Sequence, residues 1–262
     1  MAERRTHEVL VEEQFGAQAK AYLDSAVHSQ GPDLLALASL VRGSSEARVL
    51  DLGCGAGHVA FNIAPHVAQV VAYDLSPKML EVVRASAIER GLGNVVVQQG
   101  AAERLPFQDD SFDFVLSRYS AHHWLDLDAG LREAARVLKR GGAAAFVDTV
   151  SPGRPVLDTF IQSLELLRDP SHVRNYSRPE WEAALVRADF VLGGVTPYKI
   201  RLEFASWVQR MRSPPVMVSA IRALQEAVSA SIKHHFQIGS DGSFDLDVAI
   251  FHATKRAGQR ND

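Results

Sequence analysis

The sequence has 262 residues, of which 47% are apolar and 23% charged, as in an ordinary globular protein with one large domain or one domain and a cap. The formal net charge of −3 argues against a nucleic-acid partner, and no stretch approaches the roughly 18 uninterrupted apolar residues of a membrane-spanning helix. Cys54 is the single cysteine, which excludes an intrachain disulfide and a cysteine-cluster metal site. Composition therefore favours a small-molecule partner and, with no apolar leader behind the first residues, a cytoplasmic location.

Two helical patterns precede the first strand, one over residues 11–29 and one over residues 32–41. Helices at this place often cover a site instead of building the core. We therefore expect residues 1–42 to form an N-terminal lid.

The middle of the chain alternates short apolar runs with helical patterns, which is typical of βαβ units. The runs are as apolar as strands that are buried on both faces of a parallel sheet. Strands are predicted over residues 48–52, 69–73, 94–98, 112–116 and 143–147. They define a core over residues 43–150.

Local signals mark two helices between these strands. Ser76 is a typical N-cap, Pro77 suits the first helical position, and Gly91 suits the end of the helix about four turns later. Asp128 and the pair Gly141–Gly142 are expected to bracket a second helix.

The regular alternation of predicted strands and helices ends after the fifth strand. Helices are predicted over residues 155–168, 178–188 and 204–237, and strands over residues 190–202 and 244–254. Residues 151–262 should thus complete the sheet and add a helical cap. The predicted fold is a Rossmann-like sheet of seven mostly parallel strands, with helices on both faces.

A glycine-rich turn follows the first predicted strand, where ligands of open α/β sheets bind. Gly53, Gly55 and Gly57 allow a tight turn and a close approach of a ligand to the backbone. The spacing is G-x-G-x-G, and His58 stands where a dinucleotide-binding turn needs glycine. Nicotinamide binding is therefore disfavoured, although a plain strand-to-helix turn remains an alternative.

Polar residues also follow the next two predicted strands. Asp74 ends the second strand, where its carboxylate could accept the hydroxyls of a ribose or form an Asx turn before Ser76. The third strand leads into the segment 100–107, which contains Ala102 and Glu103.

Together, these motifs resemble the class I S-adenosylmethionine (SAM)-dependent methyltransferases, and in particular the group of ubiquinone and menaquinone C-methyltransferases. The general signature covers residues 48–148. Three further stretches, residues 13–22, 117–124 and 171–176, resemble an uncharacterised enteric-bacterial branch of that group. The resemblance implies SAM as cofactor and S-adenosylhomocysteine (SAH) as product.

The resemblance also implies donor-site roles, residue by residue. Ser117 would lie beneath the sulfonium, and the three glycines would pack against the methionine part of SAM. Ala101 departs from many relatives, which carry an aspartate there against the adenine amino group; Glu103 or a backbone group could replace that contact. The other implied SAM-binding residues are Asp74 at the ribose, Leu75 and Met79 beside the adenine, and Ala102 and Glu103 at its edge. Apart from the resemblance, Phe15, Tyr22 and Trp124 are candidates for an aromatic wall around the sulfonium, or alternatively for packing within the lid.

The acceptor is expected to face the segment after the fourth strand. There, His122 or His123 could take a proton from the acceptor, since an imidazole titrates near neutral pH. Alternatively, both rings are packed or bonded to the backbone, and a base is not obligatory because positioning alone accelerates methyl transfer. Paired histidines without a recognisable third ligand do not indicate a metal.

Further polar and aromatic residues are candidates for binding the acceptor. If the arginines among them point inward, the acceptor is anionic, because guanidinium matches a carboxylate in a bidentate fork; on a solvated face they would not bind it. These candidates are Tyr119, Trp124, His172, Arg174, Tyr176, Arg210 and Arg212.

The sequence thus favours methyl transfer from SAM to oxygen, nitrogen or carbon of a small organic acceptor. Two alternatives remain: a SAM-binding enzyme with another chemistry, and a non-catalytic SAM-binding protein. We expect no nucleic-acid partner, because no basic stripe or RNA-binding module is present, and no membrane partner. A monomer and a homodimer are both compatible with the sequence.

Overall fold

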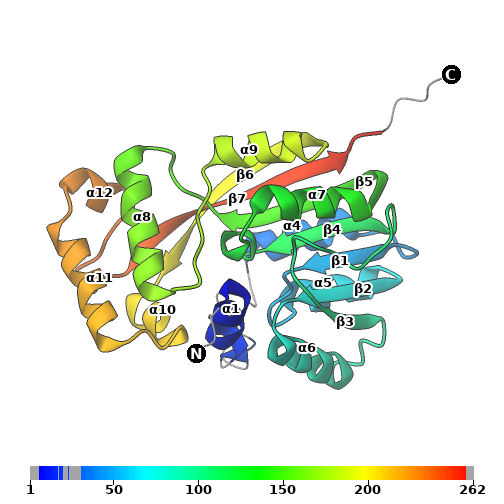
Figure 1. The fold of residues 1–262 in the computed structure, drawn as a ribbon, viewed down its shortest axis with the longest axis horizontal. Coiled ribbons are helices and arrows are strands. Elements are labelled where there is room, and N and C mark those ends of the chain that lie inside the picture. The colour runs from blue at the N-terminus through cyan, green and yellow to red at the C-terminus, as the bar shows by residue number, and fades with distance from the viewer. Residues whose placement is uncertain (1–5, 17, 20–22, 24–30, 258–262) are drawn as a thin grey trace.

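The computed structural model describes residues 6–16, 18–19, 23 and 31–257. Its centre is a seven-stranded sheet with the order β3-β2-β1-β4-β5-β7-β6 (Figure 1). The strands are β1 (Arg48–Leu52), β2 (Gln69–Asp74), β3 (Val95–Gln99), β4 (Phe112–Arg118), β5 (Leu138–Thr149), β6 (Phe190–Leu202) and β7 (Phe244–Lys255). The predicted fold class is confirmed.

Strands β1 to β5 are parallel to one another, whereas β7 runs antiparallel to both of its neighbours, β5 and β6. The strand order reverses beside β1, between β2 and β4. Because parallel strands end at one edge, the turns after β1, β2 and β4 meet there.

Helices cover both faces of the sheet. The described helices are α1 (His7–Gly16), α4 (Pro32–Val41), α5 (His58–Ile63), α6 (Pro77–Glu89), α7 (Leu127–Val137), α8 (Pro155–Arg168), α9 (Arg178–Arg187), α10 (Phe204–Arg210), α11 (Pro215–Ala227) and α12 (Ala230–His235), with short 3-10 turns η1 (Ala64–His66) and η2 (Ala121–His123). Alternate side chains of one strand face opposite layers: Leu50 packs in a cluster with α7 and α9, and Val49 in a cluster with α4, α5 and α6.

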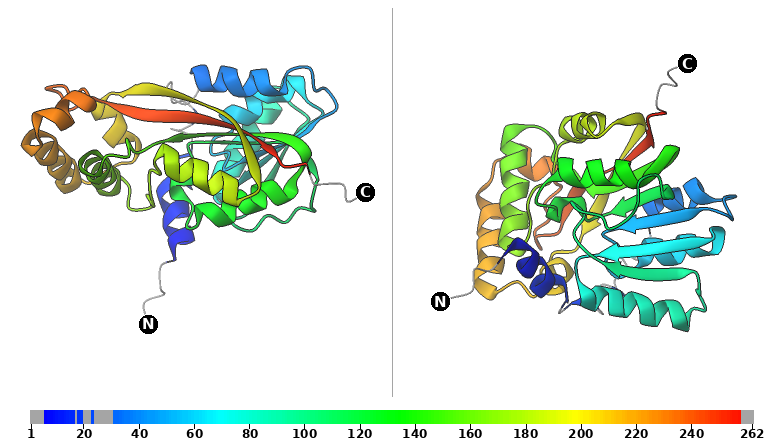
Figure 2. Two further views of the ribbon diagram at one scale, coloured as in Figure 1. Left: turned by 90° about the horizontal axis from the view of Figure 1, so that it is seen from above. Right: turned by 45° about the vertical axis from the view of Figure 1, so that its right-hand side comes forward.

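The long strands β6 and β7 extend past the rest of the sheet to a third apolar cluster. This cluster joins them to α8, α10, α11 and α12, with Trp207 and Phe236 fully buried in it. The four helices lie to one side of the sheet, and α1 lies between them and the sheet (Figures 1 and 2). None of the described helices has the length and apolar character that crossing a membrane requires.

The prediction of one helix over residues 204–237 is wrong. The segment forms three helices, and Pro214–Pro215 separates the first two. Proline lacks a backbone N–H and clashes with the preceding turn, so Pro215 begins α11 instead of continuing α10. The apolar pattern carried through this break because all three helices pack on one cluster.

Three predicted boundaries also need correction. The N-cap of α7 is Asp126, whose side chain accepts from Ala129 N at 2.9 Å, and not Asp128. This helix ends at Val137, and Gly141–Gly142 lie inside β5, where the register with β4 shifts. Helix α1 begins at His7, upstream of the predicted start, and much of the predicted 11–29 helix falls outside the described residues.

Candidate functional site

A large cavity lies at the carboxyl ends of β1, β2 and β4, where the strand order reverses. It encloses about 1120 Å³ of space, part of it open to solvent. We call it the first cavity. The predicted site residues that line it are Phe15, Gly53, Gly55, Asp74, Leu75, Met79, Ala102, Glu103, Tyr119, His123 and Trp124.

The glycine-rich turn forms one wall of the first cavity. All three glycines have positive φ, at 71° for Gly53, 50° for Gly55 and 87° for Gly57. A Cβ on Gly53 would lie 1.8 Å from Ser120 Oγ, whereas a Cβ on Gly55 would meet no atom within 4 Å and would enter the cavity. Gly57 differs from the prediction, because it faces the Phe61 ring and does not line the cavity.

Asp74 combines the two alternatives considered for it. Its Oδ1 accepts from Ser76 N at 2.9 Å, which is the Asx turn, and its Oδ2 accepts from Gly55 N at 2.8 Å. The carboxylate also lines the first cavity, so it orders the turn and faces the space beside it. Burial raises the pKa of Asp74, although the backbone hydrogen bonds oppose that shift.

Asp51 begins the glycine-rich turn and also lines the first cavity, although the motif predicts no role for its side chain. Its Oδ2 accepts from Ala60 N at 3.0 Å, while its Oδ1 is buried without a hydrogen-bond partner among the described residues. Burial raises the pKa of this carboxyl to about 7. A buried, unpaired acceptor at a cavity wall fits a cationic group of a ligand.

The loop after β3 lines another part of the first cavity. Ala102 is buried there, and the carbonyl of Ala101 accepts from the Tyr73 hydroxyl at 3.2 Å. Glu103 lines the cavity while its Oε1 accepts from Leu125 N at 2.8 Å. Glu103 therefore connects the loop after β3 to the segment after β4.

Ser117 also differs from the prediction. Ser117 is buried within β4 opposite Phe146 and does not line the first cavity. The cavity is lined instead by the three residues that follow it, Arg118, Tyr119 and Ser120. Tyr22 lies outside the described residues.

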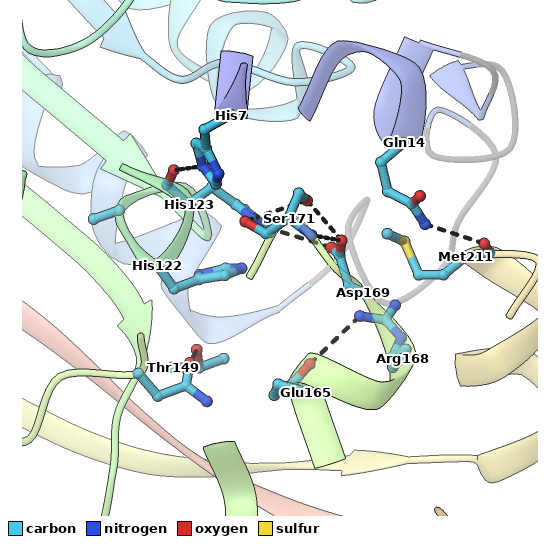
Figure 3. Close-up of polar contacts among 12 residues, drawn as sticks. His7, Gln14, His122, His123, Thr149, Glu165, Arg168, Asp169, Ser171 and Met211 are labelled. Atoms are coloured by element: carbon cyan, nitrogen blue, oxygen red, sulfur yellow. Dashed lines mark hydrogen bonds and ion pairs between the residues drawn. The ribbon is translucent and has the colours of Figure 1, made fainter. Parts of the chain in front are cut away.

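A second cavity of about 590 Å³ adjoins the first. Phe15, Tyr119 and His123 line both cavities, so the two spaces share one wall. The polar residues that line only the second cavity are His122, Thr149, Glu165, Arg168 and Arg210, and Figure 3 shows several of them gathered around one space.

Asp148 of β5, the residue after the predicted strand 143–147, holds His122 at the wall of the second cavity. The distance from His122 Nδ1 to Asp148 Oδ1 is 2.5 Å. Nδ1 is the donor, because an ionised carboxylate only accepts. Burial lowers the pKa of His122, but the carboxylates of Asp148, Glu165 and Asp169 outweigh burial and place the pKa above its ordinary value.

His123 is bonded differently. Its Nδ1 lies 3.1 Å from the Ser171 carbonyl, and its ring meets Phe15 edge-on with 4.8 Å between centroids. Its own carbonyl lies 3.0 Å from His7 Nε2 on α1. Burial and the neighbouring His122 lower the pKa of His123 to about 4, so this ring is neutral at pH 7.

Among the other candidate acceptor residues, some line a cavity and others do not. Arg210 lines the second cavity, but His172, Arg174 and Tyr176 line neither cavity. Arg174 pairs with Asp158 at 3.3 Å and Glu180 at 3.1 Å.

His172 and Tyr176 contact neighbouring side chains outside the lining of the two cavities. His172 Nε2 lies 3.0 Å from Gln162 Oε1, and burial lowers the pKa of this histidine to about 2. Tyr176 packs against the core cluster of α7 and α9. Arg212 also lies outside the lining of both cavities.

Helix α8 supplies charges to the second cavity that the sequence did not reveal. Glu165 Oε2 lies 3.6 Å from Arg168 Nη1, and both side chains are about nine-tenths buried. Arg168 also donates to the Trp207 carbonyl at 3.0 Å and stacks over the Trp207 ring. Burial raises the pKa of Glu165, and Arg168 counteracts that shift. Within the described part of the chain, no group of histidine, cysteine or acidic residues is arranged to hold a metal ion.

Comparison with known proteins identifies the family. A family profile described as "Methyltransferase domain" matches residues 50–146. The chain is 46% identical over 205 residues to "Uncharacterized protein YafE" of Escherichia coli K12, covering 78% of this chain and 99% of the relative. It is 41% identical over 247 residues to "Uncharacterized methyltransferase YcgJ" of Bacillus subtilis, covering 92% and 98%. The chain belongs to the class I SAM-dependent methyltransferases.

The crystal structure of YcgJ matches this methyltransferase with a TM-score of 0.82 and 37% identity, covering 86% of this chain and 98% of that one. The demethylmenaquinone methyltransferase of Chlorobaculum parvum is more distant. It is 36% identical over 118 residues, which cover 45% of this methyltransferase and 47% of the relative. The family implies SAM as methyl donor.

Proposed function

We propose that this methyltransferase transfers the methyl group of SAM to a small organic acceptor, with SAM in the first cavity and the acceptor in the second. The observation that carries this proposal is the wall shared by the two cavities, formed by Phe15, Tyr119 and His123. Methyl transfer requires the reacting atoms about 3–3.5 Å apart and in line. Two adjoining spaces that meet at one wall suit that requirement.

Features of the first cavity support its assignment to SAM. Gly55 leaves the backbone open to the methionine part, and the unpaired Asp51 Oδ1 suits an ammonium group. Asp74 lines the cavity where it would contact the ribose, while Leu75 and Met79 supply apolar surface for the adenine. Phe15 at the shared wall could attract the sulfonium through its ring face, worth roughly 0.5–2 kcal/mol.

We further propose a division of tasks along the chain. Residues 1–42 would act as a lid, since Phe15 of α1 lines both cavities and Gln14 Nε2 donates to the Met211 carbonyl at 3.3 Å. Residues 43–150 would hold SAM. Residues 151–262 would complete the sheet and hold the acceptor through α8 and α10, which provide Arg168 and Arg210. A cytoplasmic location and a monomer or homodimer stay predictions.

The test is an isotope-tracing experiment with the full chain. The protein is incubated with methyl-deuterated SAM and a pool of small metabolites, and mass spectrometry searches for products that carry the label. We expect a labelled small molecule together with one equivalent of SAH. Label in no product, while SAH still binds by calorimetry, would favour a binding protein; transfer of the aminoalkyl chain instead of the methyl group would favour the other SAM chemistry.

A further inference from the structure

The two nitrogens of His122 have different surroundings. Nδ1 is hydrogen-bonded to Asp148 at 2.5 Å. Nε2 has no hydrogen-bond partner among the described residues, and it is not fully buried. The side chain is 16% exposed and lines the second cavity. With the proton on Nδ1, the lone pair of Nε2 is accessible from that cavity.

Asp148 fixes both the ring and the turn that carries it. Its Oδ2 accepts from Ala121 N at 2.8 Å and from His122 N at 3.3 Å, and its Oδ1 accepts from Thr149 N at 2.8 Å. A carboxylate anchored by three backbone donors cannot swing away from the imidazole. It holds the tautomer in which Nε2 is the basic atom, and it stabilises the imidazolium after a proton is taken up.

His123 lacks this arrangement. Its Nδ1 is bonded to the Ser171 carbonyl, and its Nε2 lies 3.9 Å from Asp169 Oδ2, so protein groups face both nitrogens. Of the two histidines after β4, His122 is thus the one with a basic nitrogen available to a molecule in the second cavity.

The other residues that line the second cavity indicate the chemical character of the rest of that molecule. Part of the wall is apolar or aromatic and comes from α1, β6, α10 and β7: Phe15, Ile200, Leu202, Trp207 and Leu246. Charged groups of Glu165, Arg168 and Arg210 line the same cavity, so it suits a compact molecule that has an apolar part together with polar groups.

Resting on the function proposed above, we propose that the acceptor is a ring-bearing molecule with an acidic hydroxyl group, and that His122 is the general base for that hydroxyl. Asp148 is the positioning residue for His122. The acceptor class therefore includes phenols and enols.

The step balances without a further reactant. The hydroxyl proton moves to His122 Nε2 as the oxygen attacks the methyl carbon. The new C–O bond forms while the C–S bond breaks, and its electron pair stays on sulfur to give neutral SAH. The products are a methyl ether, SAH and an imidazolium paired with Asp148, which then returns its proton to water.

The pH dependence follows from the surroundings of His122. The free imidazole accumulates as pH rises through its pKa, which lies above 6.5. Turnover should therefore rise with pH above 6.5 and then level off. The charged and titratable groups that face this ring come from several elements. They are Asp148 of β5, His123 of η2, Glu165 and Arg168 of α8, Arg210 of α10, and Asp169 and His172 of the segment after α8.

The first test observes His122 directly, without requiring the natural acceptor. The SAH complex of the full chain is labelled with ¹⁵N-histidine, and its imidazole resonances are followed by NMR while phenol or anisole is added. Phenol should shift the Nε2 resonance of His122, and anisole, which has the same ring but no ionisable proton, should not. His235, paired with Asp247 at 2.7 Å, is an internal control that neither probe should affect. Equal effects of the two probes, or none, overturn the proposal.

The second test uses two variants. His122→Asn keeps an N–H donor for Asp148 but lacks Nε2; it should reduce label transfer by about 100-fold or more, with SAH affinity retained. Asp148→Asn should lower the pH midpoint of the His122 resonance. Wild-type turnover in His122→Asn, or an unmoved midpoint in Asp148→Asn, rejects the base while leaving methyl transfer intact. Loss of SAH binding by the wild-type protein would instead reject the function on which the proposal rests.

Discussion

The two cavities are built in different ways. The first is formed largely by backbone turns at neighbouring strand ends, and its carboxylates, Asp51 and Asp74, are held by backbone N–H groups. The second is formed by side chains from α1, η2, α8, α10 and the long strands, and Glu165 and Arg168 there neutralise each other. A site made of backbone is reproduced wherever the fold is kept, whereas a site made of side chains can change its ligand by substitution.

The largest effect is expected from the ion pair in the second cavity. Arg168→Met leaves the buried Glu165 carboxylate without its cation, which should lower the free energy of unfolding by about 3 kcal/mol. Denaturant unfolding measures this loss. The double variant with Glu165→Gln should recover part of it, and SAH affinity should stay within about twofold because the first cavity does not depend on the pair. A double variant as unstable as Arg168→Met would show that the ion pair does not matter.

Asp74 tests the first cavity at its carboxylate. Asp74→Ala should weaken SAH binding by about 10–100-fold if this carboxylate holds the ribose, because charge-assisted hydrogen bonds are worth about 1.5–3 kcal/mol. Calorimetry gives the affinity. Asp113→Ala is a matched control, since Asp113 also accepts from a backbone N–H, Arg48 N at 2.9 Å, but lies away from the cavity. Unchanged affinity in Asp74→Ala would reject the ribose assignment.

Gly55 tests the first cavity at its backbone. Gly55 and Gly43 both have positive φ, and a Cβ would clash with nothing at either position. Alanine at either site should cost about 1–2 kcal/mol of stability. Only Gly55→Ala should also weaken SAH binding, by about tenfold, because its methyl group enters the cavity. Equal SAH affinities of the two variants would contradict a backbone-built donor site.

Asp51 of the first cavity should make the free energy of unfolding depend on pH. Burial raises its folded pKa to about 7 from an ordinary value of 3.8. Between these values the folded state binds more protons than the unfolded state, so the free energy of unfolding falls as pH rises, by up to about 1.4 kcal/mol per pH unit. Asp51→Asn should remove this component, which unfolding curves at several pH values would reveal. Parallel pH curves for the two proteins would be the contrary result.

The periodicity of the sequence was sufficient for most of the fold. The strands of the core are short apolar runs, and signals such as Ser76 and Pro77 act within one helical turn, so neighbouring residues decide them. The 204–237 segment was predicted wrongly because its apolar pattern continues across Pro214–Pro215. Burial on one common cluster preserved the pattern while proline broke the backbone.

The same distinction applies to the site. The glycine turn and Asp74 stand at the ends of consecutive strands, and a parallel sheet brings such ends to one edge, so the chain itself determines the first cavity. The contact between His122 and Asp148, and that between Phe15 and His123, join residues far apart in the chain. Only tertiary packing decided which ring nitrogen is accessible and which helix lines the second cavity, because no local pattern encodes which distant side chains will meet.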